Sequence, residues 1–136
     1  MAASLLDTDI LSEILKQKNP IVVQKAATYL QTHQQFTFSA ITRYEVLRGL
    51  KAKSARRQLQ QFATFCQHCQ ILPVTDGIFD SAADLWAAAH AGGRPKKDTD
   101  LLIAATTLEH GLTLVTGNAV DFSWVLGLTI VDWRQP

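Results

Sequence analysis

The sequence predicts an α/β domain in which helices cover both faces of a central parallel sheet. Short apolar or β-branched segments alternate with longer segments whose apolar residues recur at helical spacing, and no repeat, low-complexity segment or long linker interrupts them. Such alternation is typical of parallel strands joined by helices. With 136 residues, of which 47% are apolar and 18% are charged, the chain is expected to form one domain over residues 1–136.

About five short strands are expected, at residues 3–6, 36–39, 71–74, 112–116 and 128–132. The first four helices each follow a residue that can cap a helix N-terminus; these residues are Asp7 or Asp9, Asn19, Ser39 and Ser54. A fifth helix is expected from near Thr75 to Gly92-Gly93, and a sixth from about residue 99 to 110 with Gly111 after its end.

The two cysteines, Cys66 and Cys69, form a C-x-x-C pair, which could be a redox pair or half of a zinc site. A redox pair is expected at the start of a helix, where the helix dipole lowers the pKa of a thiol. This pair lies near the end of an expected helix, at helical spacing with Leu59 and Phe62, and no second cysteine pair completes a zinc site. We therefore expect both cysteines to belong to the core.

Four acidic residues lie where an expected strand gives way to a helix: Asp7, Glu45, Asp100 and Asp121. In an open parallel sheet the carboxyl ends of the strands share one edge, and ligands bind at that edge. Carboxylates that converge there repel one another unless a cation lies between them. The pattern therefore predicts a shared magnesium site.

Each of these acids also has a local explanation. Asp7 or Asp9 could cap a helix, and Glu45 could accept a backbone N–H in a capping box that begins at Thr42. Asp100 could complement a helix dipole. Local roles of this kind do not explain why acids occur at successive strand ends, so the hypothesis of a shared site is retained beside them.

Basic residues gather on both sides of the acids, although the net charge of +1 favours no particular partner. One cluster contains Arg43, Arg48, Lys51, Lys53, Arg56 and Arg57, and the other contains Arg94, Lys96 and Lys97. Positive rims beside an acidic centre suit a polyphosphate substrate. Either cluster alone could also be a solvated helix face or a mobile loop.

Four segments carry a resemblance to a known family: Leu5-Leu-Asp-Thr-Asp-Ile-Leu-Ser12, Ser39-Ala-Ile-Thr-Arg-Tyr-Glu-Val-Leu-Arg-Gly49, Asp100-Leu-Leu-Ile-Ala-Ala-Thr-Thr-Leu-Glu-His-Gly111 and Leu114-Val-Thr-Gly-Asn-Ala-Val-Asp-Phe122. In this order and spacing they resemble the PIN-domain ribonucleases, in particular the VapC-type toxins of bacterial toxin–antitoxin pairs. The resemblance runs nearly end to end. It implies a three-layer α/β/α PIN fold and a metal-dependent endoribonuclease that acts as a toxin.

Position by position, the resemblance implies that Asp7, Glu45 and Asp100 are the catalytic acids and hold one or two Mg²⁺ or Mn²⁺ ions. Asn118 occupies the fourth acidic position of the family, so whether a second ion binds is left open. Asp121 is near enough to bind an ion through a water. Other oxygen ligands or supporting hydroxyls are expected from Asp9, Thr8, Ser39 and Thr116. Magnesium prefers oxygen ligands and keeps several waters, so two or three carboxylates suffice to hold it.

For an RNA substrate, we expect phosphate contacts from Arg43, Arg48, Arg94, Lys96 and Lys97. The resemblance alone implies a homodimer and inhibition by a small antitoxin protein. No apolar stretch approaches the ~20 residues of a membrane span, and no basic segment precedes the N-terminal apolar residues as in a secretory signal. A cytoplasmic protein with no membrane partner is therefore expected.

Two alternatives remain at this point. An inactive PIN domain could act as an RNA-binding or assembly module, as the departure at Asn118 would allow. The Asp7-Thr-Asp9 segment also resembles the D-x-D motif of haloacid-dehalogenase-type phosphatases, in which the first carboxylate is the nucleophile and the second the general acid. The phosphatase alternative gives Glu45 no role.

Overall fold

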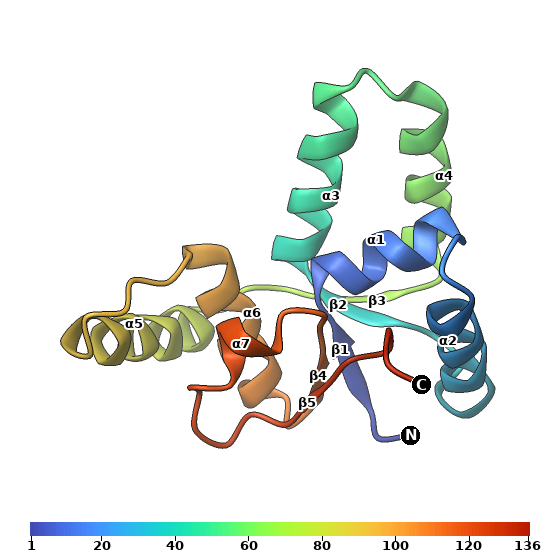
Figure 1. Cartoon of the computed structure of the whole chain (residues 1–136). Helices are drawn as coiled ribbons and strands as arrows, with labels where there is room; N and C mark the ends of the chain where they lie inside the picture. Colours follow the sequence, from blue (N-terminus) through green and yellow to red (C-terminus); the bar gives the residue numbers. More distant parts are fainter.

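The computed structural model describes residues 1–136 and has five strands and seven helices (Figure 1). The strands are β1 (Ser4–Leu6), β2 (Thr37–Ser39), β3 (Gln70–Leu72), β4 (Thr113–Val115) and β5 (Ile130–Val131). The helices are α1 (Thr8–Lys16), α2 (Pro20–His33), α3 (Ala40–Ala52), α4 (Arg56–Gln67), α5 (Asp76–Ala91), α6 (Asp98–Glu109) and α7 (Ala119–Phe122). All five expected strands form, and the short α7 is the one helix that the sequence pattern does not predict.

Every strand pair is parallel, as expected, but the hydrogen bonds form two ladders instead of one continuous sheet. One ladder has the order β1-β4-β5, and the other pairs β2 with β3. Strands β1 and β2 lie beside each other and join the two ladders at the centre of the molecule (Figure 1). The strands are two or three residues long, so the sheet is narrow and its carboxyl edge is compact.

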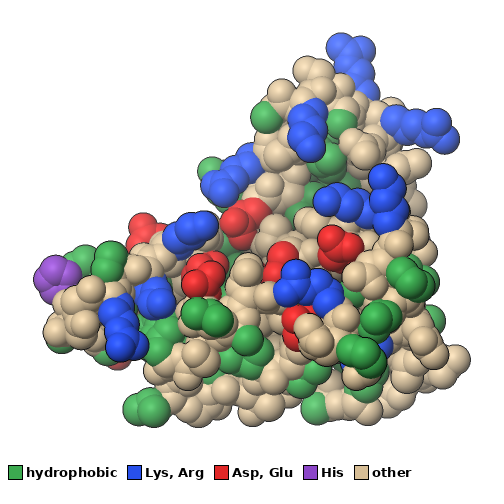
Figure 2. All heavy atoms as spheres, viewed as in Figure 1, with side chains coloured by type: hydrophobic (Ala, Val, Ile, Leu, Met, Phe, Trp, Pro, Cys, Tyr) green, Lys and Arg blue, Asp and Glu red, His purple; other side chains and the backbone are tan.

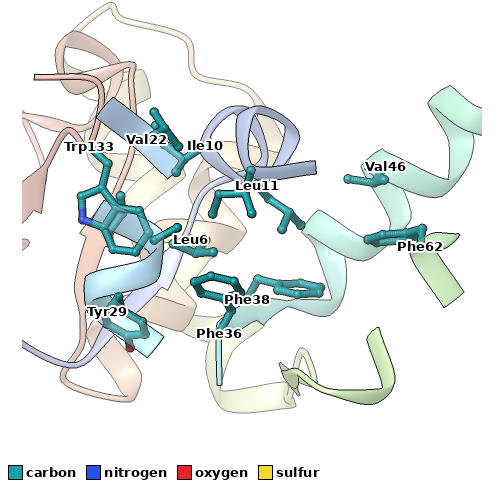
Figure 3. Packing of buried hydrophobic residues seen from close by; sticks show 13 residues of the cluster. Leu6, Ile10, Leu11, Val22, Tyr29, Phe36, Phe38, Val46, Phe62 and Trp133 are labelled. Carbon is teal, nitrogen blue, oxygen red and sulfur yellow. The ribbon is translucent and has the colours of Figure 1, made fainter. Parts of the chain in front are cut away.

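Alternate residues of the central strands point into different hydrophobic clusters, which makes the fold three-layered. Leu6 and Val115 pack with α1 and α2 in one cluster, whose side chains Figure 3 shows. Leu5 and Leu114 pack with α6 and α7 in the other. The period of two along β1 and β4 therefore buries both faces of the sheet. The predicted three-layer α/β/α fold is confirmed.

Most of the expected helix caps form, but Ser54 is not one of them. Asp7, Asn19 and Ser39 each cap their helix with a side-chain oxygen, and so does Thr75, near which a helix was expected to begin. The N-cap of α4 is Ala55, which makes no side-chain cap bond. Ser54 instead has a left-handed φ of 52°, and this conformation closes the tight connection between α3 and α4. The prediction of a Ser54 cap was therefore wrong.

Helices α3 and α4 form an antiparallel pair that projects from the carboxyl edge of the sheet (Figure 1). Cys66 and Cys69 lie at the end of this pair, where both are half-buried against the main hydrophobic cluster and carry free thiols. Burial raises the pKa of Cys69 to about 12, so this thiol is unreactive at neutral pH. No helix is long and apolar enough to span a membrane.

Candidate metal centre at the carboxyl edge of the sheet

Strand register places Asp7 beside Thr116. Leu6 lies opposite Val115 in the β1–β4 ladder, so the next residue of each strand emerges at the same edge. The Thr116 hydroxyl donates to Asp7 Oδ2 over 2.8 Å, and the Thr8 backbone N–H donates to Asp7 Oδ1 over 2.8 Å. Asp7 is only 5% exposed. The carboxylate is therefore fixed by two donors on the floor of the site.

The charge of Asp7 has no basic partner. Burial, together with the charges of Asp9 and Asp100, raises the pKa of Asp7 from 3.8 to about 7, although the hydrogen bonds from Thr116 and Thr8 lower it. The two ion pairs of the chain join other residues. A buried carboxylate without a cationic partner is costly, because it loses hydration and gains no compensating charge. Such a carboxylate is suited to a cation from solution.

Glu45 reaches the site from α3. Thr8 Oγ1 donates to Glu45 Oε1 over 2.7 Å and lies 3.1 Å from the buried Thr42 hydroxyl. The guanidinium of Arg48 is 3.6 Å from Glu45 Oε2. Glu45 makes none of the bonds of a capping box, so that local explanation is wrong. Its bond with Thr8 instead links α3 to α1 at the site.

Asp100 reaches the site from the first turn of α6. Its pKa is raised by burial and by the charges of Asp121, Glu45 and Asp9, while the charge of Lys97 lowers it. The acids are therefore close enough to repel one another. Figure 2 shows acidic side chains gathered in the angle between the projecting helices and the body, with Lys and Arg around them.

Asp9 lies close to Asp7 but makes bonds of its own. Its Oδ2 accepts from the Gly117 backbone N–H over 2.9 Å, and its Oδ1 accepts from the Ile10 N–H over 2.8 Å. Burial raises the pKa of Asp9, and these N–H groups together with the charge of Arg134 lower it. Asp9 is thus partly satisfied by backbone donors.

The remaining polar positions have distinct surroundings. Asn118 is exposed at the start of α7, makes no side-chain cap bond, and donates its backbone N–H to Thr116 Oγ1 over 3.0 Å. Asp121 is exposed in the first turn of α7 and acts on Asp100 through its charge. The Ser39 hydroxyl is buried and accepts from the Ile41 N–H, so it caps α3.

Of the five basic residues expected to contact RNA, Arg48 and Lys97 interact with acids of the site, whereas Arg43 and Arg94 do not. Arg48 pairs with Glu45 and lies over the exposed ring of Tyr44. Arg43 lies near the Cys66 thiol of α4. The loop between α5 and α6 carries Arg94, Lys96 and Lys97, of which Lys96 lies over the ring of Trp124 and Lys97 acts on Asp100.

The donor set fits a hard divalent cation. The groups around Asp7 are carboxylate and hydroxyl oxygens, which Mg²⁺ and Mn²⁺ prefer, and no cysteine or histidine joins them. No three Asp, Glu, His or Cys side chains lie close enough to enclose an ion by themselves. A magnesium ion that keeps several waters needs one or two direct carboxylates. Asp7 and Asp100, which act on each other through their charges, are carboxylates of this kind.

The structure also assigns polar contacts that the sequence analysis missed. Thr42 was interpreted as part of a capping box, and its buried hydroxyl instead supports Thr8. Gly117 donates its N–H to Asp9, and its carbonyl accepts from Arg134, which lies near the end of the chain. The charge of Arg134 also acts on Asp9. The Gly after Thr116 is a local signal for a close approach of other atoms, but no local pattern identifies Arg134 as its partner.

Comparisons with known proteins identify the family. A family model described as "PIN domain" matches residues 4–123. The chain belongs to the PIN-domain family. The match includes Asp7-Thr-Asp9, on which the haloacid-dehalogenase alternative rested, and that alternative is therefore wrong.

Two curated relatives are VapC proteins of nearly equal length, which confirms the predicted resemblance. The "VapC ribonuclease Y4jK" of Sinorhizobium fredii (strain NBRC 101917 / NGR234) is 31% identical over 140 residues, covering 97% of this chain and 98% of the relative. The "tRNA(fMet)-specific endonuclease VapC" of Shigella flexneri is 26% identical over 134 residues, with 98% and 99% coverage.

Solved structures show the same fold. DNA-bound VapBC from Salmonella typhimurium superposes with a TM-score of 0.85 at 24% identity, covering 98% of this chain and 99% of the other. A toxin–antitoxin complex from Klebsiella pneumoniae gives a TM-score of 0.76 at 26% identity, with 96% and 98% coverage. The PIN fold expected from the sequence is therefore present in full.

Proposed function

We propose that this PIN domain is a metal-dependent endoribonuclease and the toxin of a toxin–antitoxin pair. The observation that carries the proposal is the buried Asp7 carboxylate, which has no basic partner and lies within the electrostatic reach of Asp100 at the carboxyl edge of the sheet. The VapC relatives, both named as nucleases, support ribonuclease activity.

Asp7, Asp100 and Glu45 are the residues that would hold Mg²⁺ or Mn²⁺. A divalent ion there supplies Lewis-acid polarisation of a phosphate oxygen and offsets the charge that develops during phosphodiester hydrolysis. Thr116 and Thr8 orient Asp7 and Glu45 through their hydrogen bonds. Attack of water on phosphorus, with the 3′ oxygen leaving as a hydroxyl, gives 5′-phosphate and 3′-hydroxyl ends.

These basic residues would hold the RNA backbone on both sides of the acids. Lys96 and Lys97 lie on the α6 side, and Arg48 lies on the α3 side beside Glu45. A phosphate approaching Glu45 competes for the Arg48 guanidinium, which would release Glu45 towards the ion. The exposed positions of Arg43 and Arg94 suit contacts further along the RNA.

Cleavage of a total RNA pool by the antitoxin-free protein tests this function. We expect discrete cuts with Mg²⁺, none with a chelator, and none with Asp100→Asn. Asp84→Asn is the matched control, because Asp84 is exposed on α5 and belongs to no contact of the site. Cuts that persist in Asp100→Asn would refute the assignment. RNA binding without any cleavage would favour the inactive module that Asn118 allows.

A groove beside Glu45 supports inhibition by an antitoxin. A cavity of about 500 Å³ lies between α1, α3 and α4; Thr8 and Glu45 are part of its lining, as are the apolar Val46 and Leu50. Gly49 also lines it, and a Cβ atom at Gly49 would have no atom within 4 Å. A protein segment bound in this groove would cover Glu45. Gly49→Gln should reduce inhibition by the cognate antitoxin, whereas Ala27→Gln, at an exposed position of α2, should not.

The expected homodimer has a candidate surface between α5 and α6. A groove of about 390 Å³ is lined mainly by apolar residues and includes Phe79 and Trp86, which are 51% and 49% exposed. Burying two half-exposed aromatic rings per subunit contributes a few kcal/mol to association. Trp86→Glu should therefore yield a monomer in sedimentation, and an unchanged dimer would place the interface elsewhere.

A further inference from the structure

The backbone of Gly117 is held by charged side chains at both of its peptide groups. Its N–H donates to Asp9 Oδ2 over 2.9 Å, and its carbonyl accepts from the Arg134 guanidinium. A Cβ atom placed on Gly117 would collide with the guanidinium of Arg134. The guanidinium therefore lies against the glycine backbone, and a larger residue at position 117 would displace it.

Strand order explains how a residue from the end of the chain reaches this place. Strand β5 lies beside β4 with Val131 opposite Val115, and the Thr116 N–H donates to the Val131 carbonyl. Asp132 accepts from the Arg134 backbone N–H over 2.9 Å and from Arg134 Nε over 3.3 Å. Trp133, only 2% exposed, anchors the turn in the core. The Arg134 side chain is thus held in place by the residues that precede it.

The residues on either side of Gly117 belong to the candidate metal centre. Thr116 donates to Asp7 Oδ2, and its hydroxyl oxygen accepts from the Asn118 N–H. A rotation of the Gly117 backbone would move the peptide groups that Gly117 shares with Thr116 and Asn118. The orientation of the hydroxyl on Asp7 therefore depends on what holds Gly117.

We infer that Arg134 and Asp9 are positioning residues that hold the Gly117 backbone in place and so orient the Thr116 hydroxyl towards the Asp7 carboxylate. In this role Asp9 serves the backbone and is not a direct metal ligand. The inference rests on the proposed function of the Asp7 site, and neither residue touches the reacting atoms.

A simpler explanation for the position of Arg134 is its ion pair with Asp132 alone. The geometry distinguishes this explanation from the proposed bracing of Gly117. An Arg134–Asp132 pair by itself needs neither the bond to the Gly117 carbonyl nor the absence of a side chain at position 117. The brace needs both. It also predicts that changes at positions 117 and 134 are coupled, since each removes the same contact.

Hydrogen exchange of the Gly117 amide tests whether the brace exists, with no metal or RNA present. The amide should be protected in the wild type and should exchange at least about tenfold faster in Arg134→Ala. Arg57→Ala, which removes an exposed arginine of α4, should leave the rate unchanged. Equal exchange rates in the wild type and Arg134→Ala would overturn the brace.

Mn²⁺ affinity, measured by calorimetry on Arg134→Ala, Gly117→Ala and the double variant, tests the positioning role. Each single change should weaken binding several-fold, and the double variant should be no weaker than either single one. Arg134→Lys, which keeps one donor for the Gly117 carbonyl, should recover part of the affinity. Additive losses, or affinity equal to the wild type at an unchanged unfolding midpoint, would overturn the inference.

The two measurements separate this inference from the proposed function. A wild type that binds Mn²⁺ and cleaves RNA, with Arg134→Ala identical to it, refutes the positioning role alone. A wild type that neither binds Mn²⁺ nor cleaves RNA refutes the proposed function and the positioning role with it, while Gly117 exchange still decides whether the brace exists.

Discussion

Asp7→Asn should make the metal-free protein more stable, although it should abolish activity. The folded-state pKa of Asp7 is raised from 3.8 to about 7, so between these values the unfolded chain releases its proton before the folded one does. For an acid with a raised pKa, the stability of the wild type therefore falls as pH rises from about 4 to about 7 and is level above that. Asparagine carries no charge, so the stability of Asp7→Asn should not fall over this pH range.

The magnitude follows from the size of the shift. About three pKa units at 1.36 kcal/mol each correspond to about 4 kcal/mol at pH 8. Asparagine can still cap α1 through the Thr8 N–H, but the Thr116 hydroxyl loses its carboxylate acceptor at a cost of about 1 kcal/mol. The net gain is about 3 kcal/mol, or about 10 °C in Tm for a chain of this length.

Thermal unfolding of both proteins in a chelator, from pH 4 to pH 8, is the assay. The two midpoints should nearly coincide at pH 4 and diverge through pH 7, while the Asp84→Asn control, at an exposed position inside α5, follows the wild type. Adding Mg²⁺ should raise the wild-type midpoint and leave that of Asp7→Asn unchanged. A variant that is no more stable than the wild type at pH 8, or a difference that does not grow with pH, would refute the reasoning.

Three further predictions concern stability and RNA binding. Gly49→Ala should stabilise the chain by about 0.5–1 kcal/mol in denaturant unfolding, because Gly49 lies inside α3 with open space around its Cβ position; a loss of stability would show a hidden contact. Tyr29→Phe should cost about 1–3 kcal/mol in the same assay, since the Ser4 N–H donates to the Tyr29 hydroxyl in a buried setting, and a neutral result would mean that water replaces the hydroxyl. Replacing Lys96 and Lys97 by Gln should reduce the slope of log affinity against log salt by about 1.4 for single-stranded RNA, and an unchanged slope would remove both from the RNA-binding set.

Strand-end reasoning predicted the position of Asp7 because it depends on parallel pairing alone. Once β1 and β4 are adjacent, the residue after β1 must lie at the shared edge. Thr116, the residue after β4, was expected only from the family resemblance. The caps at Asn19 and Thr75 were predictable for a similar reason, since each is a local feature of a helix start.

Contacts set by tertiary packing were beyond the sequence. The left-handed Ser54 depends on how tightly α4 folds back on α3, which no local pattern around a serine records. The bond between Thr8 and Glu45 depends on the angle at which α3 leaves the sheet. The approach of Arg134 to Gly117 depends on the order β1-β4-β5, in which the last strand lies beside β4.

Anomalous diffraction from crystals of this protein soaked in Mn²⁺ tests the central claim most directly, because it locates the ion without relying on activity. We expect one strong peak at the carboxyl edge of the sheet, in direct contact with Asp7 and with Asp100 or Glu45. The peak should be absent from crystals of Asp7→Asn. A peak elsewhere, or none at an Mn²⁺ concentration that supports RNA cleavage, would contradict the assignment of these acids as the metal centre.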